Sequence, residues 1–317
     1  MMFFWKKTLH LLLVVFIVSI LSFLLVDLLP ADVAYELAGY ESTPEEVEVL
    51  REQLGLNDPV MVRYGRWLSG VFQGDLGVSL MNREPVWQAI TARLPVTIEL
   101  LVIAQFFALL LAIPAGIFAA YKAETRSDQA LGSLAFGLVS IPNFALAILL
   151  IFIFSLQLKW LPATGYTPLS EGLWPNLKGF LLPASAIALA EWVPLMRVLR
   201  SDMITTLQED YILLARSQGL PTRRILFRHA LRPSCFTLLT IFGLQIGHLI
   251  GGALIVEMVF ALPGIGRLMV AAIFAQDSTV LQGCVLFIAT GYLLINFLVD
   301  LGYRLLDPRI RSERSHG

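Results

Sequence analysis

Between two long apolar stretches lies the sequence Asp210-Tyr-Ile-Leu-Leu-Ala-Arg-Ser-Gln-Gly219-Leu-Pro-Thr-Arg-Arg-Ile-Leu-Phe-Arg-His229-Ala-Leu-Arg232. With Arg197-Val-Leu-Arg200 upstream, it forms a lysine-free segment, residues 197–232, that holds seven arginines and three acids. The flanking stretches are each long enough to cross a bilayer. A polar segment of this kind, fixed between two membrane spans, offers a surface that another molecule can grip.

Composition places the chain in a membrane. Hydrophobic residues make up 57% of its 317 residues and charged residues 15%, and the mean hydropathy is +0.74. Soluble domains carry about 25% charged residues. The formal net charge of -1 excludes a general attraction to nucleic acid. Cys235 and Cys284 fall inside apolar stretches without metal-ligand spacing, which predicts two buried small hydrophobes.

Six apolar segments approach the roughly 20 helical residues that a hydrocarbon core requires. The predicted fold class is therefore all-α, a polytopic membrane protein with six transmembrane helices. The first apolar run is longer than the core of a signal peptide, which predicts an uncleaved anchor. The segments are residues 8–29, 97–121, 129–158, 179–199, 234–256 and 278–299.

The distribution of cations predicts the orientation. Fifteen of the 23 lysines and arginines fall on the side that holds both termini and residues 197–232. Five of the other eight lie in the long first loop, where the positive-inside rule has least force. Both termini are therefore expected to be cytoplasmic.

The predicted organisation has four parts. Residues 1–29 form the cytoplasmic N-terminus and first span, 30–95 an extracytoplasmic loop, 96–304 the transmembrane domain with a cytoplasmic loop at about 201–232, and 305–317 a cytoplasmic tail. Within the first loop, Thr43-Pro-Glu-Glu46 has the spacing of a capping box, Gly55 is placed to stop that helix, and a second amphipathic helix is expected over 62–72. The loop is either a solvated cap or a docking surface.

Glycine, proline and ionisable residues occur within the spans. Pro114, Pro142, Pro183 and Pro194 are expected to interrupt helices, and Gly243, Gly247 and Gly251 form a stripe that permits close helix packing. Charges inside a membrane are costly, so Glu191, Glu257 and His248 are candidate pathway or gating residues. The alternative is that Glu257, with Glu99 and Asp300, pairs at a membrane interface, and that His248 only packs.

No catalytic motif is present. The sequence contains no G-x-x-x-x-G-K-[ST], HExxH or GxSxG pattern, and it offers no metal site. The chain is not expected to be an enzyme. If ATP drives its function, the ATPase is a separate chain.

The arginine-rich segment is predicted to form two short helices joined by a turn. Tyr211, Leu214, Ala215 and Gln218 fall on one helical face, and Gly219 stands where a left-handed C-terminal cap is expected. Leu220-Pro221 then ends the helix before Thr222 begins another. The residues themselves leave three readings open: a docking surface, a topology signal that also touches anionic lipid, and a DNA-binding helix-turn-helix.

At these residues the chain resembles permease subunits of the dipeptide and oligopeptide branch of binding-protein-dependent ABC importers. The cytoplasmic motif is similar to the EAA loop of that branch. Further matches follow in order along the chain. They are Gly74-Asp-Leu-Gly77, Leu94-Pro-Val-Thr-Ile-Glu99, Leu161-Pro-Ala-Thr-Gly165-Tyr166, Gly251-Gly252, Val256-Glu257, Phe260, Pro263-Gly-Ile-Gly266 and Asp307-Pro-Arg-Ile-Arg311.

The resemblance implies the type I importer permease fold and a multi-pass location in the inner membrane of a bacterium. It implies a second homologous permease, two ATP-binding subunits that hold ATP and Mg, an extracytoplasmic substrate-binding protein and transport by alternating access, with no cofactor in this chain. The implied ATPase-coupling residues are Asp210, Tyr211, Leu214, Ala215, Arg216, Gly219 and Leu220. The sequence departs from the family at Leu213, where the glutamate of the EAA motif would stand, and Arg216 is the candidate polar contact in its place.

Dipeptides and short oligopeptides are the expected substrates. Nickel chelates, glutathione and other small solutes are the alternatives within the same architecture. A secondary transporter and a membrane scaffold are the rivals from other classes, and neither accounts for the ordered matches.

Overall fold

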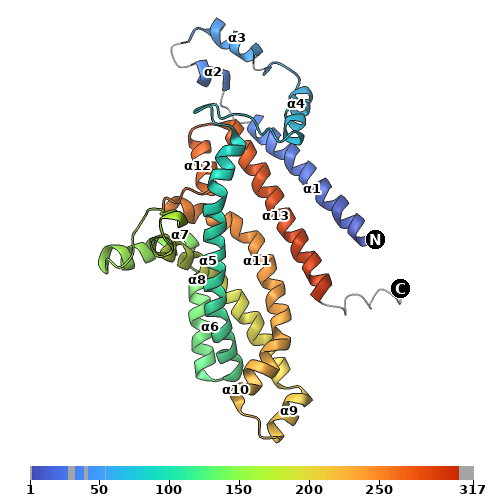
Figure 1. Ribbon diagram of the computed structural model, residues 1–317, viewed down its shortest axis with the longest axis vertical. Coiled ribbons are helices and arrows are strands. Elements are labelled where there is room, and N and C mark those ends of the chain that lie inside the picture. The colour runs from blue at the N-terminus through green and yellow to red at the C-terminus, as the bar shows by residue number, and fades with distance from the viewer. Residues whose placement is uncertain (1, 28–32, 39–41, 54, 307–317) are drawn as a thin grey trace. The chain divides into compact units, whose positions relative to one another are not determined.

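The computed structural model describes residues 2–27, 33–38, 42–53 and 55–306 (Figure 1). The described residues are helical apart from their connections and one isolated bridge between Val78 and Pro85. The α-helices are α1 (Met2–Asp27), α2 (Val33–Ala38), α3 (Pro44–Gln53), α4 (Val60–Phe72), α5 (Val86–Tyr121), α6 (Arg126–Val139), α7 (Asn143–Leu150), α8 (Leu173–Leu207), α9 (Asp210–Ser217), α10 (Thr222–Arg224), α11 (Leu231–Val259), α12 (Ile265–Phe274) and α13 (Ser278–Leu306). Two π-helical segments, η1 (Ile151–Gln157) and η3 (Ile225–Ala230), and a 3-10 turn, η2 (Leu169–Glu171), complete the list.

The predicted fold class is confirmed. Four described helices, α1, α5, α8 and α13, are long and apolar enough to cross a membrane, and two bent pairs bring the number to six. One pair bends by 99° between α6 and α7, where Pro142 precedes α7. The other bends by 61° within α11, between Gly247 and Gly251.

The predicted interruptions differ from the observed ones. Pro183 and Pro194 lie inside the continuous helix α8, and Pro114 lies inside α5. The stripe of glycines coincides with the bend in α11, and a Cβ on Gly251 would meet no atom within 4 Å. At Gly251 the structure therefore shows a bend with open space beside it, and close packing of another helix against the stripe stays a prediction.

The described chain divides into two compact units. Unit 1 comprises Met1–Val96 with Pro263–Leu294, and unit 2 comprises Thr97–Leu262 with Ile295–Gly317. Helices α5 and α13 contribute to both. The division of function among residues 1–29, 30–95, 96–304 and 305–317 stays a prediction.

Unit 1 contains the two amphipathic helices predicted for the first loop. The capping box at the start of α3 is complete, since the Thr43 N–H donates to Glu46 Oε2 at 2.9 Å and the Glu46 N–H donates to Thr43 Oγ1 at 3.4 Å. Gly55 follows α3 in the left-handed conformation, with φ of 65°. Helix α4 packs on α1 through Tyr64, whose ring lies 5.5 Å from that of Phe23.

The Gly74-Asp-Leu-Gly77 motif attaches the first loop to the start of α13, within unit 1. Gly77 has φ of 89°, and its N–H donates to Asp75 Oδ1 at 2.8 Å. The Ser79 hydroxyl then donates to Asp277 Oδ2, while Asp277 Oδ1 accepts the Val280 N–H at 3.2 Å and caps α13. One carboxylate therefore fixes both the loop and the helix end.

Unit 2 is built around α8. Small residues of α5 let it approach α8 closely, since a Cβ on Gly116 would lie 2.9 Å from Leu199 Cδ2. The buried cluster joins α5, α6, α8, η3 and α11, and consists of Ala108, Ala112, Ile117, Ala119, Ala120, Ala135, Ala188, Trp192, Val193, Leu195, Met196, Leu199, Met203, Leu226, Ala230 and Leu238.

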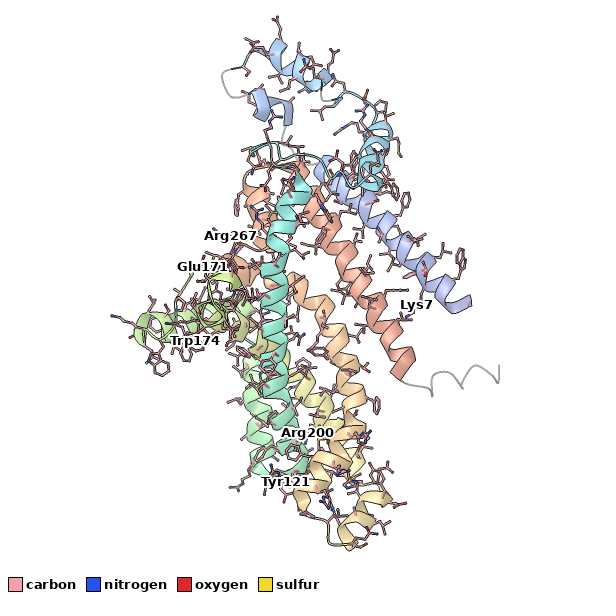
Figure 2. All side chains as sticks on the ribbon, viewed as in Figure 1. Lys7, Tyr121, Glu171, Trp174, Arg200 and Arg267 are labelled. Carbon is pink, nitrogen blue, oxygen red and sulfur yellow. The ribbon has the colours of Figure 1, made fainter. Side chains whose placement is uncertain are left out.

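A partly buried ion pair ties the α5–α6 turn to α8. Arg200 Nε donates to Asp128 Oδ1 at 2.8 Å, and Arg200 Nη2 donates to Asp128 Oδ2. Asp128 Oδ2 also accepts the N–H of Glu124, which has φ of 65° in the turn. Figure 2 labels Arg200 on α8 and Tyr121, the last residue of α5, both toward the lower end of the view. The pair therefore holds the turn, α6 and the end of α8 in one arrangement.

We expect Asp128→Asn to lower the free energy of unfolding by about 2–3 kcal/mol, because it leaves Arg200 without its counter-charge in a largely apolar site. A third of the Arg200 side chain remains exposed, which moderates the loss. The double variant D128L/R200M removes both charges and should recover most of the free energy of unfolding that Asp128→Asn loses. Thermal unfolding of the purified chain in detergent measures the stability of both variants. An equal loss of stability in the single and double variants would contradict the stabilising role of the pair.

Candidate functional site

The candidate site is α9 with the turn that follows it, between the end of α8 and the start of α11. Helix α9 begins directly after α8, since Gln208 and Glu209 donate their N–H groups back to Thr205 and Thr206. In Figure 1, α9 and α10 lie together at one end of unit 2. A short helix with so little free chain on either side is held rigidly by its neighbours.

Gly219 ends α9 in the way the sequence predicts. Its φ is 77°, its N–H donates to the Arg216 carbonyl at 3.0 Å, and the Leu220 N–H donates to the Ala215 carbonyl at 3.2 Å. These two bonds form a Schellman motif, which satisfies carbonyls at the helix end and requires a left-handed residue. A Cβ on Gly219 would meet no atom within 4 Å, so the requirement for glycine comes from the backbone alone.

The second predicted short helix is not separate. Helix α10 begins at Thr222 as expected, but it runs without a break through η3 into α11. The prediction of two short helices was therefore wrong for the second one, because apolar Ile225, Leu226 and Ala230 are buried and extend the span toward the aqueous side. The turn at Gly219-Leu220-Pro221 leads from α9 straight into a membrane helix.

A hydrogen bond joins α9 to this continuous helix. Pro233 has no N–H to donate to the carbonyl of His229, four residues earlier. The helix widens to π geometry over η3, and the Tyr211 hydroxyl donates to the His229 carbonyl at 3.4 Å. Burial, and then the charge of Glu209, raise the pKa of Tyr211. This bond connects α9 to the residues that lead directly into α11.

The two faces of α9 differ from the predicted division. Ile212 and Ala215 are buried, whereas Tyr211, Leu213 and Leu214 are 46%, 52% and 58% exposed. Tyr211, Leu214 and Ala215 share one side of the helix, as predicted, but Ala215 lies at its edge beside Ile212 and packs against the protein. The sequence analysis missed Ile212, whose place among apolar neighbours gave no signal of its anchoring role.

Polar residues surround the exposed apolar face. Asp210 opens α9, and Arg216 lies in its last turn, with both side chains exposed. Behind the helix is a cavity of about 580 Å³, lined by Arg216 and Leu220 together with residues of α5, α8 and η3. All seven predicted coupling residues, Asp210, Tyr211, Leu214, Ala215, Arg216, Gly219 and Leu220, therefore belong to one short helix and its cap.

The ionisable residues predicted within the spans lie elsewhere in unit 2. Glu257 is fully buried near the end of α11 and accepts a hydrogen bond from Thr97 Oγ1 at 2.7 Å. Glu191 lies mid-way along α8 and is half-buried. His248 falls in α11, but its side chain lies outside what the structure describes, as does that of Asp300.

Comparison with known proteins identifies the family. A family model described as the binding-protein-dependent transport system inner membrane component matches residues 112–312. The chain belongs to this family. A model for the N-terminal part of such membrane components matches residues 1–101, so the permease is covered almost from end to end. The family predicted from the ordered motifs is confirmed.

Individual relatives of this permease are similar over nearly their whole length. A putative peptide transport system permease protein of Brucella abortus (strain 2308) is 43% identical over 300 residues, which cover 95% of this chain and 96% of the relative. A probable peptide ABC transporter permease of Sinorhizobium fredii is 37% identical over 93% of this chain and 94% of its own. The glutathione transport system permease GsiC of Escherichia coli (strain K12) is 35% identical over 96% and 97%.

A solved structure shares the fold. The inward-facing MetNI methionine ABC transporter aligns with a TM-score of 0.57 and 14% identity, covering 68% of this chain and 95% of that one. This likeness extends the family assignment to three dimensions: the permease has the fold of an ABC importer membrane subunit.

We expect Tyr211→Phe to increase amide hydrogen exchange in residues 210–218 by about fivefold, because a hydrogen bond worth about 1 kcal/mol holds α9 to the His229 carbonyl. Adding Pro233→Ala restores a backbone N–H four residues after His229 and should return α11 to a regular ladder without restoring protection of α9. Exchange followed by mass spectrometry separates the two segments. Unchanged exchange in α9 of the Phe variant would contradict a role for the hydroxyl.

Proposed function

We propose that this permease forms half of the translocation pathway of an ABC importer for dipeptides or short oligopeptides. The peptide transport relatives, similar over 95% of the chain, support this substrate class. Glutathione, itself a short peptide, is the second candidate because the GsiC permease is 35% identical over 96% of the chain. Nickel chelates and other small solutes remain further alternatives.

The proposed assembly pairs this chain with a second homologous permease. Two separate ATP-binding subunits hold ATP and Mg, since the sequence has no phosphate-binding loop. An extracytoplasmic binding protein delivers the substrate, and both termini of the permease lie in the cytoplasm. The permease itself carries no cofactor and performs no catalysis.

The exposed face of α9 is the observation that carries the coupling role. Tyr211, Leu213 and Leu214 present apolar surface to the aqueous side, on a helix whose other face is anchored by Ile212. Exposed apolar groups rimmed by charge are typical of a protein interface. We assign this face to a groove on an ATPase subunit, where Leu213 replaces the polar contact of the family glutamate with an apolar one.

Alternating access then follows from the connections of α9. Closure of the ATPase subunits moves α9, and the movement passes to α8 through a two-residue link and to α11 through the Gly219 cap and the Tyr211–His229 bond. Because α8 and α11 pack together in unit 2, the two spans move as one body. In this proposal the permease switches between inward-facing and outward-facing states in response to ATP.

The test reconstitutes the permease with its second permease, ATPases and binding protein, and measures uptake of labelled peptide together with ATP hydrolysis. We expect Gly219→Val to lower uptake about tenfold with hydrolysis retained, because a β-branched residue disfavours the left-handed conformation of the cap. Gly219→Asn is the matched control, since asparagine tolerates this conformation and should transport nearly as well as wild type. Fully coupled uptake by the valine variant would overturn the assignment.

A further inference from the structure

Two glutamine side chains inside the spans of unit 2 are buried with polar atoms that have no partner among the described residues. Gln105 of α5 is 6% exposed, and neither its Oε1 nor its Nε2 has a hydrogen-bond partner among the described residues. Gln245 of α11 is 8% exposed, and its Oε1 is likewise without a partner there. Burying unpaired amide groups in an apolar interior destabilises a fold. Their presence therefore calls for an explanation.

A hydrogen bond to the backbone accounts for only part of the buried side chain of Gln245. Pro194 has no N–H for the carbonyl of Ala190, which weakens the ladder of α8 at this point. Gln245 Nε2 donates to the neighbouring Glu191 carbonyl at 3.1 Å and so braces the helix. This bond uses only the amide N–H of Gln245 and leaves its side-chain oxygen without a partner among the described residues. It gives no reason for the burial of Gln105.

The two glutamines and Glu191 lie within about one helical turn of one another along the spans. Helices α5 and α8 run in the same direction through unit 2, because Gly116 meets Leu199 and, five residues further along each helix, Tyr121 and Ile204 line one cavity. Gln105 lies eleven residues before Gly116, and Ala188 lies eleven residues before Leu199, so Gln105 and Ala188 are at the same level. Glu191 follows Ala188 by three residues, which is about 4.5 Å along the helix axis at 1.5 Å per residue. The bond from Gln245 places the third side chain at the same level.

Glu191 adds a carboxylate to this layer. The group is half-buried and has no hydrogen bond or ion pair with residues that the structure describes. The arginines further along α8 are engaged elsewhere: Arg197 lies over the Phe136 ring at 5.8 Å, and Arg200 pairs with Asp128. The layer thus combines an acidic side chain that has no partner among the described residues with three amide atoms that also have none, Gln105 Oε1, Gln105 Nε2 and Gln245 Oε1.

We propose that Gln105, Glu191 and Gln245 form a hydrogen-bonding layer that holds the peptide during its passage. The ligand that complements this set carries amide N–H and C=O groups and a cation, which are the groups of a short peptide with a free N-terminal ammonium. Glu191 receives the ammonium, and the two glutamines receive the backbone amides. This inference rests on the proposed function and adds the residues that recognise the substrate class within the membrane.

The experiment separates this role from packing through Gln105→Leu, a substitution of similar size without polar atoms. We expect it to raise the midpoint of thermal unfolding of the reconstituted complex, because an unsatisfied amide is removed, and yet to lower peptide uptake about tenfold. ATP hydrolysis stimulated by the peptide-loaded binding protein should stay within about twofold of wild type. Glu191→Gln keeps the shape, removes the charge and should lower uptake of the same free-amine dipeptide about tenfold.

Gln282 supplies the matched control. It is a glutamine of α13 in unit 1 that is 7% exposed, with Nε2 also lacking a partner among the described residues, and it lies outside the layer. Gln282→Leu should raise stability in the same way and leave uptake unchanged.

The outcomes distinguish the layer from the proposed function. Uptake by both Gln105→Leu and Glu191→Gln within about twofold of wild type would overturn the layer alone. A lower unfolding midpoint in Gln105→Leu would assign the amide to packing and also overturn it. If the wild-type complex takes up no short peptide at all, the proposed function itself fails, and the layer fails with it.

Discussion

The structure depends on one constraint: inside a membrane, backbone N–H and C=O groups must find partners within the protein. Helices satisfy most of them, and side chains supply the rest where a helix is interrupted. Tyr211 donates to the His229 carbonyl beside Pro233, and Gln245 donates to the Glu191 carbonyl beside Pro194. Asp277 caps the start of α13 in unit 1. These side-chain bonds occur close to a proline or at the start of a helix, and the bonds of Tyr211 and Gln245 also join one helix to another.

The end of unit 2 that holds α9 combines a fixed ion pair with a short exposed helix. The Asp128–Arg200 pair holds the α5–α6 turn against α8. The Gly219 cap and a short turn connect α9 to the helix that continues into α11. Between them, α9 is anchored by a narrow buried face and exposes three large apolar side chains. A helix of this kind resists bending but can be displaced as a unit. This combination suits transmission of force from a partner better than recognition of a ligand, which the polar layer deeper in the spans is suited to perform.

Comparison with known proteins assigns the whole chain to one family of transport permeases. Family models match residues 1–101 and 112–312, and relatives named as peptide and glutathione permeases align along nearly the whole chain. The departure at Leu213 acquires a physical meaning in the structure, because that position is exposed on α9. An apolar residue there extends the surface formed by Tyr211 and Leu214. The partner surface of this permease is therefore expected to be more apolar than the glutamate of the family motif would require.

The sequence by itself determined the helical class, the spans, the capping box at Thr43 and the left-handed cap at Gly219, because each depends on local periodicity or on the conformational preference of one residue. Only the tertiary structure decided which face of α9 is anchored, that α10 continues into α11, and that Asp128 pairs with Arg200. The same holds for the placement of Gln105, Glu191 and Gln245 within about one helical turn of one another. These features join residues far apart along the chain, and periodicity within one helix carries no information about which neighbour its side chains meet.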